Sequence, residues 1–243
     1  MKIYFKILLI ISLSFILFSC KKTSDDKLIM VTEAGFAPYE YNSGGEIIGV
    51  DIDIAREIAK HIGKELVVRD VAFDSLVNEL NSGKADFAAA GMSVSEERKK
   101  EVDFSIEYTT SKQVIVVRKG YDKIKKLDDL KDKTISVQLG SVADSYVVKE
   151  YPKAKLVTQK KFLGAAEDVK TGKSDCIIMD ALPAKEMVNA NKDLVILDID
   201  VFTDKYAIAV KKGNKEMLDS INEVLINLIN EGRIEEFIIN HSS

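Results

Sequence analysis

Histidine is scarce in this 243-residue chain, which contains only His61 and His241. The first lies on one face of an expected helix and the second lies near the C-terminus. No Ser–His–Asp or Cys–His set can therefore be assembled for nucleophilic catalysis. No cluster of histidine and carboxylate residues indicates a metal site, and we expect neither a metal nor a cofactor.

Cysteine is equally rare, since only Cys20 and Cys176 are present. Cys176 lies in an apolar run and Cys20 in an N-terminal segment that we expect to be processed, so a disulfide is not expected. The charge is only mildly acidic: the formal net charge is -4, and removal of residues 1–19, which carry two lysines, brings it to -6. Such a mixed surface argues against a nucleic acid as the partner.

Only one long hydrophobic run stands out, and it lies at the N-terminus. Two lysines precede residues 7–18, which are apolar except for two serines and are too short to span a bilayer. This pattern predicts a signal peptide over residues 1–19. The run ends in Leu-Phe-Ser-Cys, which resembles a bacterial lipobox and predicts lipidation of Cys20, palmitate included. Residues 20–27 then link this anchor to the domain; plain secretory cleavage nearby is the alternative.

The rest of the chain alternates between strand-like and helix-like segments, which predicts an α/β fold. Ile54, Ile58 and Ile62 recur at a spacing of four before Gly63, as in a helix that ends at a glycine. Expected strands lie at residues 28–32, 66–71, 87–91, 134–138 and 176–180, and expected helices begin near Asp51, Asp74, Ser95 and Ser141.

A short internal repeat relates two parts of the chain. Residues 82–91 and 171–180 share a helix end, a glycine, a lysine, an aspartate and a buried strand. The match places Gly91 and Asp180 at equivalent positions, where two strands end. Ligands of open α/β sheets collect beyond such strand ends. The repeat therefore suggests two related lobes, although chance can produce so short a similarity.

Arg98 occupies an unfavourable place for a cation. Ser95 is a natural N-cap, which puts Arg98 at about the third helical position, where the helix dipole is positive. An arginine, a capped helix start and free N–H groups together can hold an anion such as a carboxylate. The alternative is an Arg98 side chain that extends into solvent or pairs with Glu101. A second helix start, at Ser141 after a strand and Gly140, is a further candidate anion site or an ordinary capped helix.

Six motifs together resemble those of the extracellular solute-binding proteins of polar amino-acid ABC transporters. The resemblance covers nearly the whole mature chain. The motifs lie at residues 32–40, 49–53, 72–76, 90–105, 139–141 and 175–180.

The resemblance implies a type II periplasmic-binding-protein fold, in which two Rossmann-like lobes close on a ligand by a hinge motion. Two chain crossings are implied, near residues 108–112 and 202–206, and the return leads into a strand at 206–210. The implied domains are lobe 1, made of residues 28–109 and 206–243, and lobe 2, made of residues 110–205.

The resemblance also implies how the cleft would bind an amino acid. Arg98 would pair with the α-carboxylate and Asp180 with the α-ammonium, from opposite lobes. Phe36 and Phe73 would sandwich the side chain, and Glu33 would reach its far end. A carboxylate there favours a basic or amide side chain, unless a nearby cation of the protein cancels it. The remaining implied contacts are the Ala90 position, the Gly91 carbonyl, the Ser93 hydroxyl and N–H, the N–H of Ser141 or Val142, and Gln138.

The function predicted from these residues is capture of a free L-amino acid outside the cytoplasm and its delivery to an ABC permease. The protein would be a monomer, anchored through lipidated Cys20 in the periplasm or at the cell surface. One rival is an exported enzyme on the same scaffold, such as a dehydratase with Glu33 as its general base. Another is a stand-alone amino-acid sensor or adhesin.

Overall fold

The computed structural model describes residues 26–242. The expected signal peptide over residues 1–19 and Cys20 lie outside the described residues, as does most of the expected linker over 20–27. None of the described helices is long and apolar enough to cross a membrane.

The first lobe is built on a sheet of five strands: β1 (Lys27–Thr32), β5 (Glu65–Asp70), β6 (Phe87–Ala88), β7 (Val102–Phe104) and β13 (Ala209–Lys211). Their order is β5-β1-β6-β13-β7. β1 runs parallel to both neighbours, and β13 runs antiparallel to β6 and β7. A small sheet of β2 (Gly35–Phe36), β3 (Glu40–Ser43) and β4 (Glu46–Ile48) adjoins it.

The second lobe repeats this plan with β8 (Thr109–Arg118), β9 (Thr134–Gln138), β10 (Lys155–Gln159), β11 (Cys176–Asp180) and β12 (Leu194–Tyr206). The order β10-β9-β11-β8-β12 places β11 in the middle, as β6 is in the first sheet. Each middle strand has one parallel and one antiparallel neighbour. The internal repeat seen in the sequence therefore corresponds to the central strands of two related sheets.

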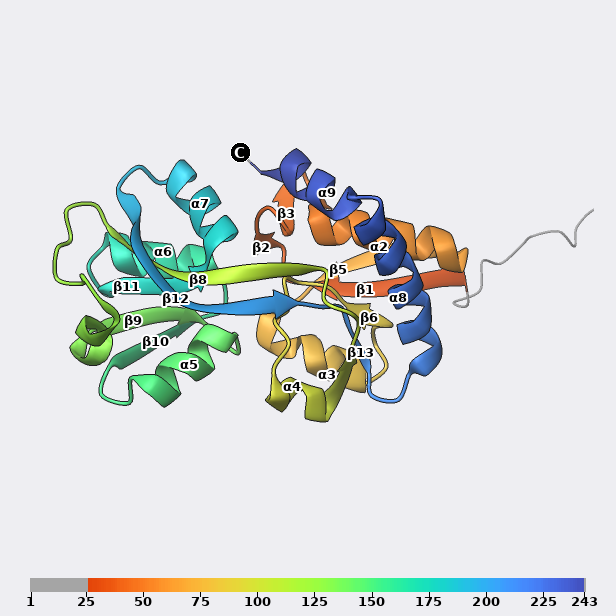
Figure 1. Ribbon diagram of the computed structural model, residues 1–243, viewed down its shortest axis with the longest axis horizontal. Helices are drawn as coiled ribbons and strands as arrows, with labels where there is room; N and C mark the ends of the chain where they lie inside the picture. The colour runs from red at the N-terminus through yellow and green to blue at the C-terminus, as the bar shows by residue number, and fades with distance from the viewer. Residues whose placement is uncertain (1–25, 243) are drawn as a thin grey trace, which may run out of the picture.

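The two lobes are joined by the long antiparallel pair β8 and β12, which runs across the middle of the molecule (Figure 1). Thr109 pairs with Tyr206 at one end and Arg118 with Leu194 at the other. The crossings are thus paired ends of long strands rather than separate short linkers. Tyr206 ends β12, and the expected strand at 206–210 begins only at Ala209. The domain boundaries inferred from the sequence stay a prediction.

Helices flank both sheets (Figure 1). Gly63 ends α2 in a left-handed conformation, with φ of 77°, as the spacing of its three isoleucines predicted. The helices are α2 (Val50–Ile62), α3 (Leu76–Asn81), α4 (Glu96–Glu101), α5 (Val142–Glu150), α6 (Phe162–Lys170), α7 (Ala181–Ala190), α8 (Lys215–Asn230) and α9 (Arg233–His241), with 3-10 turns η3 (Phe73–Ser75) and η4 (Leu127–Asp132).

Two local predictions were wrong. Asp74 does not cap a helix, because it lies in the middle of the η3 turn; Ser75 holds the N-cap position of α3, and no side chain caps it. The strand expected at 87–91 ends at Ala88. Gly91 has φ of 51°, outside the extended region, so this position cannot continue the strand.

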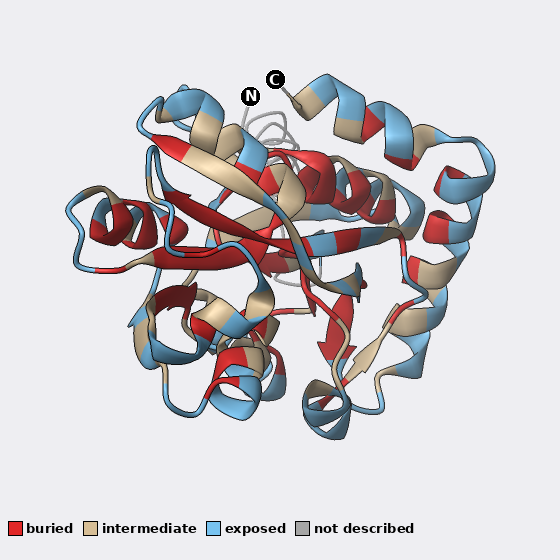
Figure 2. Ribbon diagram, turned by 60° about the vertical axis from the view of Figure 1, so that its left-hand side comes forward, coloured by how far each residue is buried: buried red, intermediate tan, exposed pale blue. Residues whose placement is uncertain are grey.

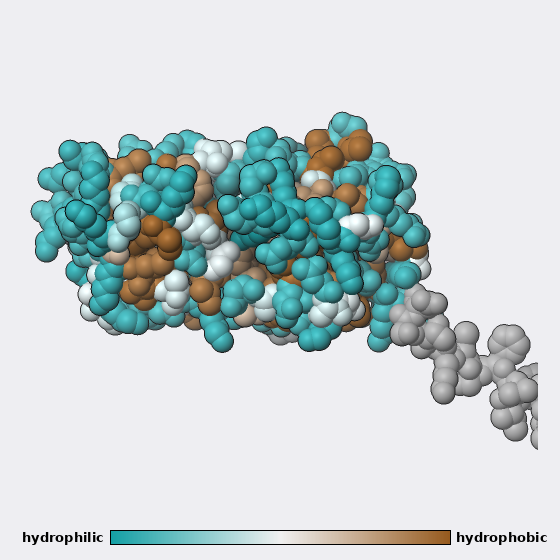
Figure 3. All heavy atoms as spheres, turned by 90° about the horizontal axis from the view of Figure 1, so that it is seen from below, coloured by the Kyte–Doolittle hydropathy of each residue, from teal (hydrophilic) through white to brown (hydrophobic). Residues whose placement is uncertain are grey.

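The buried residues form the two sheets and the inner faces of their helices, while the outer helix faces are exposed (Figure 2). A face seen from below is mostly hydrophilic, with hydrophobic residues in scattered patches (Figure 3). The buried apolar residues pack continuously, since the largest cluster includes residues from both lobes.

Candidate ligand-binding cleft

A small cavity of about 20 Å³ lies between the lobes, at the carboxyl ends of the central strands. Every residue that the sequence predicted for ligand contact lines it, with the exception of Arg98, which lines the adjoining groove together with Ser141 and Val142. Two lining residues, Glu40 and Phe162, were missed. The lining residues are Glu33, Phe36, Glu40, Phe73, Ala90, Gly91, Ser93, Gln138, Ser141, Val142, Phe162 and Asp180.

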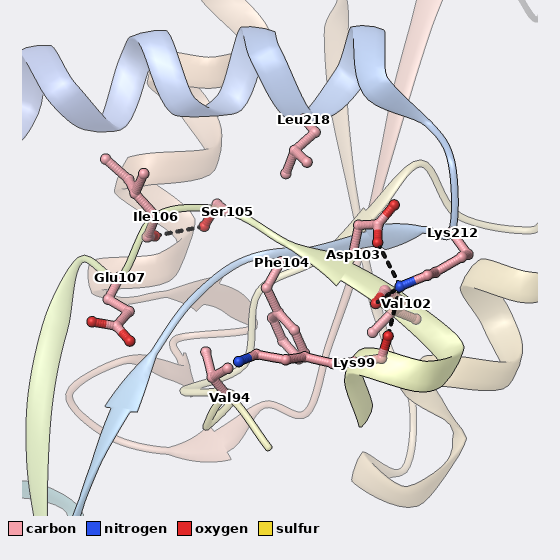
Figure 4. A pocket seen from close by; sticks show the side chains of 10 residues that line it. All are labelled: Val94, Lys99, Val102, Asp103, Phe104, Ser105, Ile106, Glu107, Lys212 and Leu218. Atoms are coloured by element: carbon pink, nitrogen blue, oxygen red, sulfur yellow. Dashed lines mark hydrogen bonds and ion pairs between the residues drawn. The ribbon is translucent and has the colours of Figure 1, made fainter. Parts of the chain in front are cut away.

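A wider hollow lies on the surface of the first lobe, between α4, β7 and α8 (Figure 4). Its polar groups already bind one another: the Lys212 ammonium lies 2.8 Å from the Asp103 carboxylate and donates to the Lys99 carbonyl at 2.6 Å. It contains none of the predicted ligand contacts. The enclosed cleft between the lobes is therefore the better candidate site, because polar groups from both lobes converge on it.

Arg98 is held at the edge of the cleft by hydrogen bonds to both lobes. The Ser95 hydroxyl accepts from the Arg98 N–H and so caps α4 as predicted. The guanidinium donates to the Ser93 carbonyl at 2.6 Å and to the Gly140 carbonyl at 2.8 Å. It therefore neither extends into solvent nor pairs with Glu101. Burial lowers the pKa of Arg98 to about 10, so the side chain stays cationic at neutral pH.

Phe36 and Phe73 both line the cleft, and each also has a partner within the protein. Their role in enclosing a ligand side chain stays a prediction. The Phe36 ring stacks on Phe162 of α6, with ring centroids 5.5 Å apart. Phe73 lies beneath the Arg98 guanidinium, 5.2 Å from the ring centroid, where a cation–π contact favours the charged side chain. Phe162 belongs to an apolar helix face, so no local pattern indicated its place in the cleft.

Ser141 begins α5 at the opposite wall. Its hydroxyl accepts from the Asp144 N–H at 3.2 Å, which confirms the predicted N-cap. Ser141 and Val142 both line the cleft, so the first turn of this helix faces the cavity. The positive end of α5 therefore lies across the cleft from α4, as two facing anion sites require.

Asp180 is the buried carboxylate at the end of β11. The Tyr206 hydroxyl donates to it from the end of β12. Burial raises the pKa of Asp180 above the ordinary value, and the Tyr206 hydrogen bond opposes the rise. Nearby, the buried Asp51 carboxylate accepts from the Gly91 N–H at 2.8 Å and from the Tyr108 hydroxyl at 2.7 Å. These bonds fix the loop whose carbonyl was predicted to bind an ammonium.

Asp204 is an acidic residue near the cleft that the sequence reasoning missed. It lies on β12 and accepts from the Ser93 hydroxyl. Burial, and then the negative charge of Asp180, raise the pKa of Asp204 to about 7. Because Asp204 lies in the segment expected to cross between the lobes, the sequence did not indicate that it would lie near the site.

Glu33 binds residues from the second lobe. Its carboxylate accepts from the Gln138 amide at 3.0 Å and lies 3.1 Å from the Lys161 ammonium. Lys161 also lies 3.3 Å from Asp70 and is half exposed, whereas Glu33 is buried. Burial raises the pKa of Glu33, and Lys161 opposes the rise. Lys161 is the kind of nearby cation that the sequence reasoning allowed for without identifying.

Glu40 adds a further buried carboxyl on β3. Neither of its oxygens has a hydrogen-bond partner among the described residues. Burial and then Asp51 raise the pKa of Glu40 well above its ordinary value. The cleft thus holds more acidic groups than cations. No group of three or more histidine, cysteine, aspartate or glutamate residues in the described chain is arranged to hold a metal ion.

Comparisons with known proteins agree with this architecture. The chain is 33% identical to the arginine-binding extracellular protein ArtP of Bacillus subtilis, over 97% of this chain and 96% of the relative. It is also 33% identical to the glutamine-binding protein GlnH of B. subtilis, over 80% of this chain and 72% of the relative. Among solved structures, the substrate-binding protein AbpA of Streptococcus pneumoniae bound to L-arginine matches with a TM-score of 0.86 at 32% identity, covering 89% of this chain and 94% of that one.

The sequence profile of one family matches residues 28–240. That match includes both lobes, the β8–β12 pair and every cleft residue described above. The chain belongs to the bacterial extracellular solute-binding proteins, family 3.

Proposed function

We propose that the protein binds a free L-amino acid with a basic side chain, arginine foremost, in the cleft and delivers it to the permease of an ABC transporter. One observation carries this proposal: Asp180 of the second lobe lines the cleft, and Arg98 of the first lobe lines the groove that adjoins it at Ser141 and Val142. A zwitterionic ligand needs fixed charges of both signs a few ångströms apart. With those charges on different lobes, its binding favours closure.

The preference for a basic side chain rests on the acidic excess of the cleft. Glu33 and Glu40 line it, and neither is bonded to Arg98. Lys161 offsets Glu33, but its half-exposed side chain can turn toward Asp70 and solvent when a cationic ligand enters. Relatives named for arginine binding and a relative solved with L-arginine support the same preference.

A binding role is favoured over catalysis because Glu33 is engaged by Gln138 and Lys161. A general base would need a free carboxylate within reach of a substrate proton.

We further propose that the protein acts as a monomeric lipoprotein, anchored outside the cytoplasm through Cys20. Mass spectrometry of the membrane fraction tests this anchor: a diacylglyceryl-modified Cys20 supports it, and a free N-terminus elsewhere contradicts it.

Thermal melting tests the proposed ligand. The soluble form beginning at Lys21 is melted with each of the twenty amino acids, ornithine and citrulline. A ligand at about 100 times its dissociation constant stabilises the folded state by roughly 2.7 kcal/mol, a shift of several degrees at this size. A dominant shift with arginine supports the proposal. A shift confined to acidic or aliphatic amino acids contradicts the preference, and no shift with any of them contradicts amino-acid binding.

A further inference from the structure

Two carboxylates, the buried Asp180 and the half-buried Asp204, flank the same strand. β8 lies between β11 and β12, and its Gln113 pairs with Asp180 while its Ser111 pairs with Asp204. Residues two apart on a strand share a face, and residues paired across strands do too. Asp180 and Asp204 therefore lie on one side of the sheet, two residues apart in register.

Each of these carboxylates accepts a hydrogen bond, Asp204 from a residue of the cleft and Asp180 from a residue of the β8–β12 pair. The Ser93 hydroxyl donates to one oxygen of Asp204, and Ser93 lines the cleft beside Asp180. The Tyr206 hydroxyl donates to Asp180. The other oxygen of Asp204 is buried and has no hydrogen-bond partner among the described residues. A buried acceptor without a donor is costly, so a donor from the ligand would stabilise this arrangement.

Near Asp204 there are two carboxylates but only one cationic side chain, that of Arg98. Asp180 faces Asp204 from β11, Arg98 from α4, and the Tyr206 hydroxyl from its own strand. The Arg98 guanidinium is already directed to the Ser93 and Gly140 carbonyls. Two carboxylates this close repel one another unless a proton or a cation lies between them.

We propose that Asp204 is a second carboxylate of the subsite that binds the α-ammonium. It brackets the ligand's ammonium together with Asp180. It also accepts the hydrogen bond that the Ser93 hydroxyl donates, which leaves the hydroxyl lone pairs free to accept from the ligand. This inference rests on the proposed function, since it requires an amino acid in the cleft.

Binding of the ammonium changes the protonation of Asp204. The pKa of Asp204 is raised to about 7, so part of the ligand-free population carries a proton on this carboxyl at neutral pH. When the ammonium enters, the Asp204 O–H bond breaks, its proton goes to the buffer, and the carboxylate that remains pairs with the ammonium. No bond of the ligand is broken. Binding at pH 7 then releases a fraction of a proton.

Calorimetric titration of the mature chain from Cys20 tests this role. L-Arginine is compared with argininic acid, which has a hydroxyl in place of the α-ammonium, in two pH 7 buffers of different ionisation enthalpy. In Asp204→Asn, the affinity for L-arginine should fall about tenfold or more, as for a lost charge-assisted hydrogen bond. Its affinity for argininic acid should stay within about twofold, and the proton release should vanish. Asp200→Asn is the matched control, because Asp200 lies exposed on the same strand beside Lys112.

The outcomes separate this inference from the proposed function. Equal losses for both ligands in Asp204→Asn, or undiminished proton release, would overturn the role of Asp204 while leaving the function intact. A wild-type chain that binds no amino acid would overturn the function and this inference together. Melting of the ligand-free variant shows whether it folds, and Asp204→Glu should restore proton release if the carboxylate itself matters.

Discussion

At the scale of single residues, Arg98 should determine whether an amino acid binds at all. Its guanidinium is fixed by two carbonyls and the Phe73 ring, so it needs little rearrangement to meet a carboxylate. Arg98→Ala should weaken L-arginine binding by about 30-fold or more, the usual effect of stranding a buried charge. Titration calorimetry measures this change. Lys99→Ala on the exposed face of the same helix is the control and should bind normally; equal binding by both variants would contradict the site.

Glu33 and Lys161 should tune which side chain is accepted. Glu33→Gln removes the charge that attracts a cation, so it should weaken arginine binding more than glutamine binding. Lys161→Met removes the competing ammonium, which lies 3.1 Å from Glu33, and should strengthen arginine binding. Competition between the two amino acids measures both effects, with the exposed Lys160→Met as control. The opposite order of losses in Glu33→Gln would refute the side-chain assignment.

At the scale of elements, the loop after β6 depends on Gly91. A Cβ there would lie 2.6 Å from the Phe36 ring, and φ is 51°. Gly91→Ala should therefore displace Phe36, weaken ligand binding and lower the free energy of unfolding by roughly 1–3 kcal/mol. Gly120→Ala is a matched control, since it also has positive φ but nothing within 4 Å. Chemical denaturation measures both; similar losses would show that backbone strain alone matters.

The elements also show what the sequence could and could not predict. Local signals were sufficient for α2, with its isoleucine spacing and Gly63, and for the caps Ser95 and Ser141. The repeat correctly indicated that the two segments hold the central strands, but β6 ends at Ala88 rather than at Gly91. Asp74 failed as a cap because a 3-10 turn precedes α3, a detail that short-range sequence preferences do not determine.

The residues that the sequence did not bring to the site share one property. Lys161 and Asp204 contact cleft residues only because distant segments of the chain are packed together. From the sequence alone Glu40 is expected to be an ordinary polar residue, but its position on β3 of the small sheet buries it. The motif residues were predictable because they resemble a family, whereas residues placed by tertiary contacts carry no local signal.

At the scale of the whole molecule, the buried acids should make the ligand-free protein less stable as the pH rises. The pKa of Asp51 is raised to about 6 and that of Asp204 to about 7, above the values expected in the unfolded chain. The folded state therefore binds protons more tightly than the unfolded state, and stability is lost as the pH rises through these values. The melting temperature should fall between pH 5 and pH 8. Asp204→Asn should flatten this dependence, and a rising melting temperature would contradict the burial of these carboxyls.

The central claim is that the cleft between the lobes binds an amino acid by its α-carboxylate and its α-ammonium. The most direct measurement is a calorimetric titration of the wild-type protein with L-arginine and with agmatine, which keeps the guanidinium but lacks the α-carboxylate. The account predicts micromolar or tighter binding of L-arginine, on the order of -8 kcal/mol, and no measurable binding of agmatine. Equal affinity for the two ligands, or binding of neither, would contradict it.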